Sequence, residues 1–259
     1  MNIIVCIKQV PETTQVQIDP KTNTLVREGV QSIINPFDMY AIEEGVRLKE
    51  KFGGKVTVLT MGPPQAESAL REAIALGCDE AVLLSDRAFA GSDTLATSYT
   101  LAMAVKKIKD FDMILCGKQA SDGDTAQVGP GISAHLDIPQ ITYVKKIEEI
   151  KDRQAIVERM TEEGFEILKS PLPCLLTVVK EINEPRLPSL KGMMRSKKAS
   201  IITWKSIDLD LEEDRLGLNG SPTQVVKIFT PPPRPKGQIF EGAPEECVEK
   251  LLETLKNQL

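Results

Sequence analysis

The sequence is short of the residue types that common catalytic and metal centres require. Its 259 residues include a single histidine, His135. One histidine is too few for a histidine-rich metal centre, and it argues against a Ser-His-Asp triad. Five cysteines lie far apart and form no C-x-x-C pair: Cys6, Cys78, Cys116, Cys174 and Cys247. We therefore expect no metal site and no disulfide framework, and we expect the thiols to be reduced.

The sequence also lacks a basic excess and long apolar runs. Lys and Arg number 32 against 37 Asp and Glu, which gives a net charge of −5 and a pI near 5.2. Such a balance argues against nucleic acid as the main partner. No apolar run approaches the length that spans a membrane, and the first residues lack the basic start and cleavage site of a signal peptide. We expect a cytoplasmic protein without membrane insertion.

The first half of the chain has a regular alternation of apolar runs and helical patterns. Strand patterns span residues 3–7, 56–61, 81–84 and 113–116, and helical patterns span residues 36–52, 65–76, 94–108 and 132–136. Asn35 and Pro36 have the residue types of a helix N-cap and first helical position. Ser92 or Asp93 can cap the helix that begins at Thr94. The alternation predicts a Rossmann-like α/β fold, with a mostly parallel sheet and helices on both faces.

The pattern changes after Pro139. Strand patterns at residues 141–147, 154–160, 164–168 and 174–179 follow one another without helices, which predicts an antiparallel addition to the sheet. A proline-rich stretch at residues 229–236 and a final amphipathic helix at 243–258 come later. We expect an α/β nucleotide-binding domain over residues 1–200. The C-terminal arm, residues 201–259, is expected to wrap around a partner subunit.

A polar loop follows the strand that ends at Cys116. In an open α/β sheet, ligands bind beyond the carboxyl ends of the strands, where this loop at 117–129 is expected to lie. Its glycines, amides and hydroxyls suit phosphate, ribose and base. Loops at 6–11, 61–65 and 85–93 are expected at the same edge. The sequence thus favours a nucleotide site over a merely solvated connection, although polar loops are common.

The helix start at residues 91–98 carries more hydroxyls than a cap needs. Thr94, Thr97 and Ser98 fall on its first turns, where free N–H groups favour phosphate. Capping by Ser92 or Asp93 alone is the alternative interpretation. The GPGISA sequence at 129–134 superficially fits a dinucleotide fingerprint, but it stands about a dozen residues after its strand and is rejected as a Rossmann turn.

Three further features have both a structural and a functional interpretation. Cys6 and Cys116 at strand ends are expected to be small buried hydrophobes. His135 is expected to be an exposed or capped side chain on a helix. The basic segment at 186–198 contains the apolar Leu190, Met193 and Met194. It is either a solvated helix over the sheet or a docking segment with an apolar anchor in a charged rim.

Several motifs together resemble one family. They are VCIKQVP at 5–11, NPFD at 35–38, AIEE at 41–44, GKQA at 117–120 and NEPR at 183–186. In this order, and over essentially the whole chain, they resemble the β subunits of electron-transferring flavoproteins. The resemblance implies a heterodimer with an α subunit that carries a flavin. It also implies that Leu190 docks into a partner acyl-CoA dehydrogenase.

The resemblance further implies an adenine-nucleotide site. The matching positions are Cys6, Asn35, Pro36, Phe37, Asp38, Met61, Gly117, Lys118, Gln119, Ala120, Ser121, Asp122, Gly123, Asp124, Thr125, Ala126, Gln127 and Val128. In one branch of the family the nucleotide is AMP and only structural. In the other it is FAD, which takes hydride from NADH and splits the electron pair. One electron goes to ferredoxin or flavodoxin and the other, through the α flavin, to an acyl-CoA dehydrogenase or reductase.

Residues 86–99 resemble the bifurcating branch. A dinucleotide has a second phosphate and a ribitol beyond the adenosine site, and Asp93, Thr94 and Thr97 are expected to hold them. We therefore expect FAD in this subunit and NAD(H) as substrate, with AMP as the alternative, and no catalysis by the subunit alone. Because the cofactor carries the redox chemistry, we expect no catalytic acid–base residue. An adenine-nucleotide sensor of the same fold is disfavoured by the proline-rich arm and the basic segment around Leu190.

Overall fold

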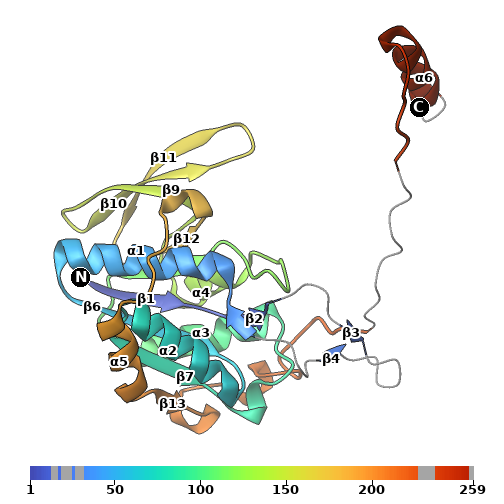
Figure 1. Ribbon diagram of the computed structural model, residues 1–259. Coiled ribbons are helices and arrows are strands. Elements are labelled where there is room, and N and C mark those ends of the chain that lie inside the picture. Colours follow the sequence, from blue (N-terminus) through green and yellow to red (C-terminus); the bar gives the residue numbers. More distant parts are fainter. Residues whose placement is uncertain (13–16, 19–24, 27–31, 227–236, 257–259) are drawn as a thin grey trace. The chain divides into compact units, whose positions relative to one another are not determined.

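The structure, a computed structural model, describes residues 1–12, 17–18, 25–26, 32–226 and 237–256 (Figure 1). The chain divides into two units, Met1–Val226 and Lys227–Leu259. The first unit has an α/β fold, and the second includes helix α6 (Pro244–Lys256). Within the described ranges, no helix has both the length and the apolar stretch needed to cross a membrane.

A nine-stranded sheet forms the centre of the first unit. Its strands are β1 (Asn2–Cys6), β6 (Lys55–Met61), β7 (Glu80–Leu84), β8 (Met113–Gly117), β9 (Gln140–Lys151), β10 (Gln154–Met160), β11 (Phe165–Pro171), β12 (Cys174–Val178) and β13 (Ile202–Trp204). Their spatial order is β11-β10-β9-β12-β8-β1-β6-β7-β13. In this spatial order, every adjacent pair in the part β9-β12-β8-β1-β6-β7-β13 is parallel. β10 pairs antiparallel with both β9 and β11. The predicted mostly parallel sheet with antiparallel additions is confirmed.

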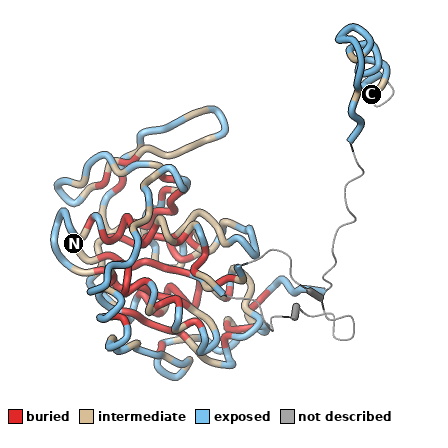
Figure 2. The backbone as a smooth tube through the Cα atoms, viewed as in Figure 1, coloured by how far each residue is buried: buried red, intermediate tan, exposed pale blue. Residues whose placement is uncertain are grey.

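Helices cover both faces of this sheet. They are α1 (Pro36–Phe52), α2 (Glu67–Leu76), α3 (Thr94–Ile108), α4 (Val128–Leu136) and α5 (Leu190–Lys198). Successive side chains of a strand point to opposite faces. Ile3 and Val5 of β1 therefore pack in the cluster that contains residues of α1 and α2. Ile4 packs in a second cluster with α3 and α4. The central strands are accordingly buried along most of their length (Figure 2).

Strand β12 differs from the expected antiparallel meander. It pairs parallel with β8 on one side and with β9 on the other. Every residue of its CLLTV sequence is buried. A continuous apolar run of this kind is typical of a parallel strand covered on both faces, whereas an antiparallel strand with one solvated face alternates. The antiparallel part of the sheet is confined to β9, β10 and β11.

Small elements were missed because their sequences are too short for periodicity to show. β2 (Gln9–Pro11) pairs with β5 (Ser32–Ile34), and β3 (Gln17–Ile18) pairs with β4 (Leu25–Val26), both antiparallel. Short 3₁₀ helices span Pro64–Ala66, Arg87–Phe89, Lys180–Ile182, Ser206–Asp208 and Glu213–Arg215. The pair β2 and β5 leads directly into Asn35, at the start of α1.

The first unit extends beyond the predicted boundary at residue 200. β13 adds to the sheet next to β7, and Leu209 and Leu216 are buried in the cluster that includes α3. Residues 201–226 therefore belong to the first unit, because their apolar side chains bury there. In the second unit, α6 exposes Val248, Leu251, Leu252 and Leu255. Their spacing places them on one face of the helix. That α6 packs on a partner subunit stays a prediction.

Candidate functional site

The order of strands in the sheet reverses between β1 and β8. From β1 the chain crosses through α1 to β6 on one side, and from β7 it returns through α3 to β8 on the other side. Cys6 and Cys116 are paired across the two strands at their carboxyl ends. In open α/β sheets, ligands bind in the crevice beyond the carboxyl ends at such a switch point. The candidate site lies here.

The structure brings the loops after neighbouring strands together at this edge. The Gln9 side chain, after β1, donates a hydrogen bond of 2.8 Å to Ser68 Oγ, just beyond the loop that follows β6. Gly62 N, after β6, donates to Leu84 O at the end of β7, over 3.0 Å. The Lys8 ammonium, after β1, lies 2.6 Å from the Asp122 carboxylate in the loop after β8. The expected convergence of the loops is therefore present in the fold.

The loop between β8 and α4 has an unusual backbone. Asp124 and Ala126 have φ angles of 53° and 54°, in the left-handed region that residues other than glycine seldom adopt. Strained backbone of this kind is often found at ligand sites, where it aims N–H groups at a ligand. Residues 121–125 and Gln127 are exposed, and residues 117–120 are half-buried. The loop thus offers a solvent-facing polar surface on a half-buried base.

The base of the loop carries a cation between two aromatic rings. Lys118 Nζ lies 5.4 Å from the ring centroids of both Phe37 and Tyr143. These rings attract the ammonium group through their π faces. Nearby, the Gln119 side chain donates a hydrogen bond to the Asp124 carboxylate. The arrangement places a positive charge and two aromatic rings next to the switch point.

Asn35 and Asp38 occupy the floor of the site and are buried. Asp38 Oδ2 accepts a hydrogen bond of 2.7 Å from Lys8 N, and its Oδ1 accepts one of 3.2 Å from Gly117 N. Asn35 Nδ2 donates to Gln119 O over 2.8 Å, and its Oδ1 accepts from Ser121 N over 3.1 Å. Asn35 stands at the N-cap position of α1 but makes no capping hydrogen bond. Its side chain joins segments distant in sequence instead.

Burial dominates the titration of Asp38. It raises the pKa of this carboxyl from 3.8 to about 7, against the hydrogen bonds from Lys8, Asn35 and Gly117, which lower the pKa. A partly protonated carboxyl repels an anionic phosphate less than a full carboxylate does. Because the pKa is higher in the folded chain than in the unfolded chain, the folded state holds the extra proton. The contribution of Asp38 to stability therefore falls as the pH rises from 3.8 to about 7.

Cys6, Cys116 and Met61 lie beneath the site. The two cysteines are buried in the cluster with α3 and α4, and Met61 packs against it. A hydrogen bond with Cys6, and then burial, raise the pKa of the Cys116 thiol well above its usual value. Both thiols are packed as small hydrophobes, in agreement with the sequence-based interpretation. Nucleotide contacts of Cys6 and Met61 stay predictions.

The Asp93 side chain caps the N-terminus of α3. Its Oδ1 accepts hydrogen bonds from Leu95 N at 2.9 Å and Ala96 N at 3.1 Å. Its Oδ2 accepts from the N–H and the hydroxyl of Thr223. Burial pushes the pKa of Asp93 up, but the hydrogen bonds from Thr223, Ala96 and Leu95 outweigh it and lower the pKa. The predicted cap is present, and it occupies N–H groups that the sequence analysis had expected to be free for phosphate.

The hydroxyls at the start of α3 border the polar loop. Thr94 Oγ1 lies 3.4 Å from Gln127 Oε1, at the end of the loop after β8. Thr97 is one turn further along the helix and is half-buried. Both side chains carry hydroxyl donors, whereas the backbone donors of Leu95 and Ala96 are occupied by Asp93. A ligand that reaches α3 from the loop is therefore expected to meet hydroxyls.

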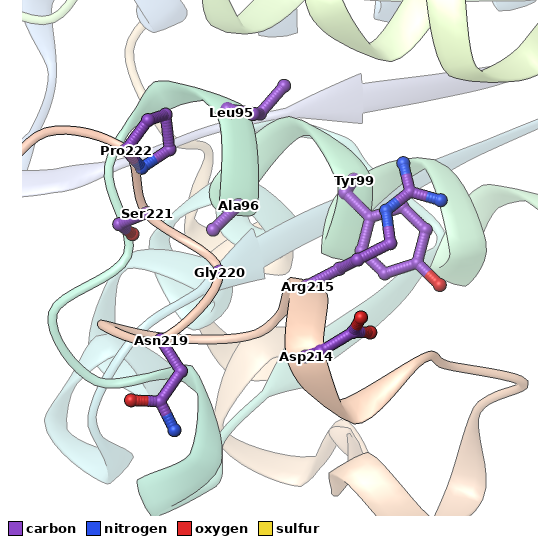
Figure 3. A pocket seen from close by; sticks show the side chains of 9 residues that line it. All are labelled: Leu95, Ala96, Tyr99, Asp214, Arg215, Asn219, Gly220, Ser221 and Pro222. Carbon is purple, nitrogen blue, oxygen red and sulfur yellow. The ribbon is translucent and has the colours of Figure 1, made fainter.

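A hollow of about 330 Å³ lies beside the first two turns of α3 (Figure 3). It is lined by Leu95, Ala96, Tyr99, Asp214, Arg215, Asn219, Gly220, Ser221 and Pro222. The Arg215 guanidinium lies 3.8 Å from the centroid of the Tyr99 ring, and His135 packs edge-on against the same ring. His135 is thus half-buried, and burial followed by the charges of Arg215 and Lys106 lowers its pKa. This hollow was not predicted, because residues 201–226 were expected to leave the domain; the apolar Leu209 and Leu216, which are buried in the structure, were the signal that they do not.

The basic segment forms a helix that is fastened to α2. Gly192 of α5 packs so closely on α2 that a Cβ there would clash with Ala75 O. Arg195 donates hydrogen bonds to Ile74 O and Cys78 O at 2.7 and 2.6 Å. Leu190 is 72 % exposed. The segment is therefore a helix packed on α2 with Leu190, Met193 and Met194 exposed, and its docking role stays a prediction.

The NEPR segment before α5 is held by α1. The Arg186 guanidinium pairs with Glu43 and Glu50 at 2.7 and 2.6 Å, and Asn183 donates to Tyr40 O at 3.0 Å. A second hollow, of about 320 Å³, lies where this segment meets α1, α2 and α5. These ion pairs were not predicted, although the acidic AIEE motif and the arginine of NEPR were the signal for them. Throughout the described residues, this region included, no group of three or more Asp, Glu, His or Cys side chains is placed to hold a metal ion.

Comparison with known proteins gives consistent matches. The profile of the family described as "Electron transfer flavoprotein domain" matches residues 22–209. The chain is 54 % identical to "Electron transfer flavoprotein subunit beta" of Thermoanaerobacterium thermosaccharolyticum, over 100 % of this chain and 99 % of the relative. It is 50 % identical to "Caffeyl-CoA reductase-Etf complex subunit CarD" of Acetobacterium woodii, over the same shares. It is 48 % identical to "Protein FixA" of Azotobacter vinelandii, over 100 % of this chain and 95 % of the relative.

Proposed function

We infer the function of this chain from its family: it belongs to the electron transfer flavoproteins and aligns with their β subunits along its whole length. Such β subunits pair with an α subunit, and the family is associated with flavin. We propose that this chain is the β subunit of a bifurcating member and binds FAD at the switch point between β1 and β8. When bound, FAD supplies the redox chemistry by taking a hydride from NADH and releasing electrons singly.

The loop after β8 is the observation that carries nucleotide binding. Its left-handed residues Asp124 and Ala126, its exposed polar side chains and the cation of Lys118 fit an adenine nucleotide. Asn35 and Asp38 support the loop from below. The role proposed for these residues is to bind and orient the nucleotide. No proton transfer is assigned to any of them.

The start of α3 favours FAD over AMP. Thr94 borders the end of the polar loop, and Thr97 follows it on the same helix. AMP has no second phosphate to place there, whereas FAD has one. The name of the relative from Acetobacterium woodii, which links it to a caffeyl-CoA reductase complex, supports a function in acyl-CoA reduction. We propose NADH as the electron donor, because the resemblance of residues 86–99 to the bifurcating branch implies it.

The proposed partners follow from exposed apolar surfaces. The exposed face of α6 is proposed to pack on the α subunit. Leu190, on the outer side of α5, is proposed to dock into an acyl-CoA dehydrogenase or reductase, with the basic side chains of α5 as a charged rim. Ferredoxin or flavodoxin is the proposed second acceptor. We place this assembly in the cytoplasm.

One observation favours the second candidate, an AMP-binding structural subunit of a simple electron carrier. Asp93 occupies the Leu95 and Ala96 N–H groups at the start of α3 and adds negative charge there. Both effects weaken a second phosphate site. The two candidates share the adenosine site and differ only at α3.

Electron bifurcation has a direct assay. The purified heterodimer with its acyl-CoA dehydrogenase is mixed with NADH and ferredoxin under anaerobic conditions, with or without the enoyl-CoA that this dehydrogenase is first shown to reduce. We expect ferredoxin to be reduced only when the acyl-CoA is present, because the two electron transfers are coupled. If NADH is not oxidised in either mixture, and electrons enter only from the dehydrogenase, the subunit belongs to a simple carrier.

A further inference from the structure

Tyr99 of α3 contacts two other elements of the first unit. It is 3 % exposed. The Arg215 guanidinium, from the short helix at Glu213–Arg215, covers the Tyr99 ring at 3.8 Å from its centroid (Figure 3). The His135 ring, from the last turn of α4, meets the same ring edge-on, with 5.5 Å between the two centroids. One buried aromatic side chain therefore joins α3, α4 and the segment that follows β13.

The segment at 209–216 is anchored by an apolar side chain at each end. Leu209 and Leu216 are buried in the cluster that contains Tyr99, whereas residues 212–214 between them are exposed. The Glu212 N–H donates a hydrogen bond of 2.9 Å to the Tyr99 hydroxyl. The guanidinium that covers the Tyr99 ring adds a cation–π contact. The polar middle of the segment is thus attached to α3 through Tyr99.

The Arg215 guanidinium also reaches the His135 ring. Arg215 Nη2 lies 3.4 Å from His135 Nδ1. A guanidinium can only donate hydrogen bonds, so it can bond to this ring nitrogen only while the nitrogen carries no proton. A proton at Nδ1 would remove the acceptor and would place two cations against each other. The contact between the two side chains therefore depends on the charge of His135.

The other charged groups around His135 do not remove this dependence. Burial, the charge of Arg215 and the charge of Lys106 on α3 all lower the pKa of His135. The carboxyl end of α4 favours a charged histidine and acts against them. The nearby carboxylates are all exposed to solvent: Glu212, Asp214 and Asp137. Glu212 pairs with Arg215 at 3.2 Å, but its side chain is 67 % exposed, so water screens its charge.

We propose that His135, Tyr99 and Arg215 form a pH-sensitive latch, which holds the segment at 209–216 on α3 at neutral pH and loosens it in acid. The latch is closed while His135 is neutral, because Arg215 then donates to Nδ1 and covers the Tyr99 ring. In the loosened state the histidine is solvated and takes up a proton more readily. Since the usual pKa of histidine is 6.5 and the closed latch lowers it, the latch weakens as the pH falls below 6.5.

Loosening of the latch is expected to alter the surroundings of α3. Asp214 and Arg215 line the hollow beside the first turns of this helix, so their movement should widen it. The same stretch of chain continues to Ser221, whose Oγ accepts a hydrogen bond of 2.8 Å from Asp93 N at the start of α3. The latch requires no bound nucleotide, so its test is independent of the proposed function.

The single histidine of this chain makes the switch directly observable. The chain is produced with isotope-labelled histidine and assembled with an unlabelled α subunit, so that His135 gives the only labelled ring signal in nuclear magnetic resonance. Hydrogen exchange, followed by mass spectrometry, reports on the peptide that covers residues 209–217. Both measurements run from about pH 8 to about pH 5, the range in which histidine changes its charge.

In the wild type, the protection of residues 209–217 should fall in acid. We expect a fall of about tenfold relative to a peptide from β10, which is a typical size for coupling between two sites. The fall should follow the titration of the His135 ring. It should be absent in His135→Phe, which keeps a ring against Tyr99 but cannot take up a proton. His135→Gln is a second variant without a titrating ring, should His135→Phe fail to fold.

A pair of arginine variants tests the partner of His135. Arg215→Met keeps much of the length of the side chain without its charge. It should raise the pKa of His135, and it should lower the protection of residues 209–217 at about pH 8 to the value that the wild type has in acid. Arg153→Met is the matched control, because Arg153 pairs with Asp112 and its side chain is 67 % exposed. This control should match the wild type in both measurements.

Three results would overturn the latch. The first is equal protection of residues 209–217 at both ends of the pH range in the wild type. The second is the same fall in protection in the wild type and in the variant without a titrating ring, because acid would then act through another group. The third is an unchanged pKa of His135 in Arg215→Met, which would show that the two side chains are not coupled.

Discussion

Replacing Thr94 and Thr97 together with valine should release FAD from the β subunit while AMP binding is retained. Valine has nearly the shape of threonine but cannot donate a hydrogen bond. A hydrogen bond to a charged phosphate contributes about 1.5–3 kcal/mol, so the loss of two should weaken FAD binding at least 100-fold. The adenosine site lies on the loop after β8 and is not altered.

The chain offers a matched control on the same helix. Thr100 is buried, and its hydroxyl donates to Ala96 O at 2.9 Å within α3. Thr100→Val makes the same chemical change one turn away from the proposed phosphate and should leave FAD content unchanged. The measurement is FAD and AMP content after extensive dialysis of the heterodimer. If the double variant keeps its full FAD content, the second phosphate of FAD does not bind at the start of α3.

Replacing Arg186 with alanine should lower the free energy of unfolding by about 2–3 kcal/mol. The guanidinium of Arg186 pairs with Glu43 at 2.7 Å, and Glu43 is 3 % exposed. Without the Arg186 guanidinium the buried carboxylate keeps Arg47, which is half exposed, as its cation, and the main-chain N–H of residue 186 as a neutral donor. The NEPR segment would also lose its connection to α1, so Leu190 should be presented less firmly to a partner.

The pH dependence of the stability loss in Arg186→Ala tests whether the Glu43 carboxyl is responsible for it. Burial pushes the pKa of Glu43 up, but hydrogen bonds from Arg186 and Arg47 outweigh it and lower the pKa below 4.5. A carboxyl whose pKa is lowered by folding stabilises the folded state at pH values above its pKa in the unfolded chain. This contribution is lost as the pH falls through the pKa of the folded state. The difference between wild type and Arg186→Ala should therefore be largest above pH 4.5 and shrink in more acidic solution.

Urea unfolding of the heterodimer at several pH values provides the measurement. Arg153→Ala is the control, because Arg153 forms an ion pair with Asp112 at 3.3 Å but is 67 % exposed. An exposed pair of this kind contributes less than about 1 kcal/mol. Equal effects of the two arginine substitutions, or a difference that does not vary with pH, would contradict the role assigned to Arg186.

The sequence was sufficient to predict features whose signals are local. The apolar run at β8, ending at Gly117, correctly placed a strand before the polar loop. Asn35 and Pro36 correctly marked the start of α1, and Asp93 the start of α3. These signals depend on neighbours in sequence, because strand burial, proline geometry and helix caps act over one or two turns.

Features that depend on distant contacts could not be predicted in this way. Asn35 has the residue type of a cap, but its side chain reaches Gln119 and Ser121 instead. β12 was expected to be antiparallel, but it pairs parallel with β8. Its position is set by burial on both faces, which the preceding turn in the sequence does not reveal. The same holds for β13, which completes the sheet far along the chain from its neighbour β7.

The nucleotide content of the purified heterodimer tests the central claim most directly. Denaturation, chromatography and absorbance give the amounts of FAD and AMP per heterodimer, with the α subunit alone as the reference for its own flavin. The account predicts two FAD per heterodimer and no AMP, because FAD extends from the polar loop to Thr94 and Thr97. One FAD and one AMP would contradict it and would make this chain the structural subunit of a simple electron carrier.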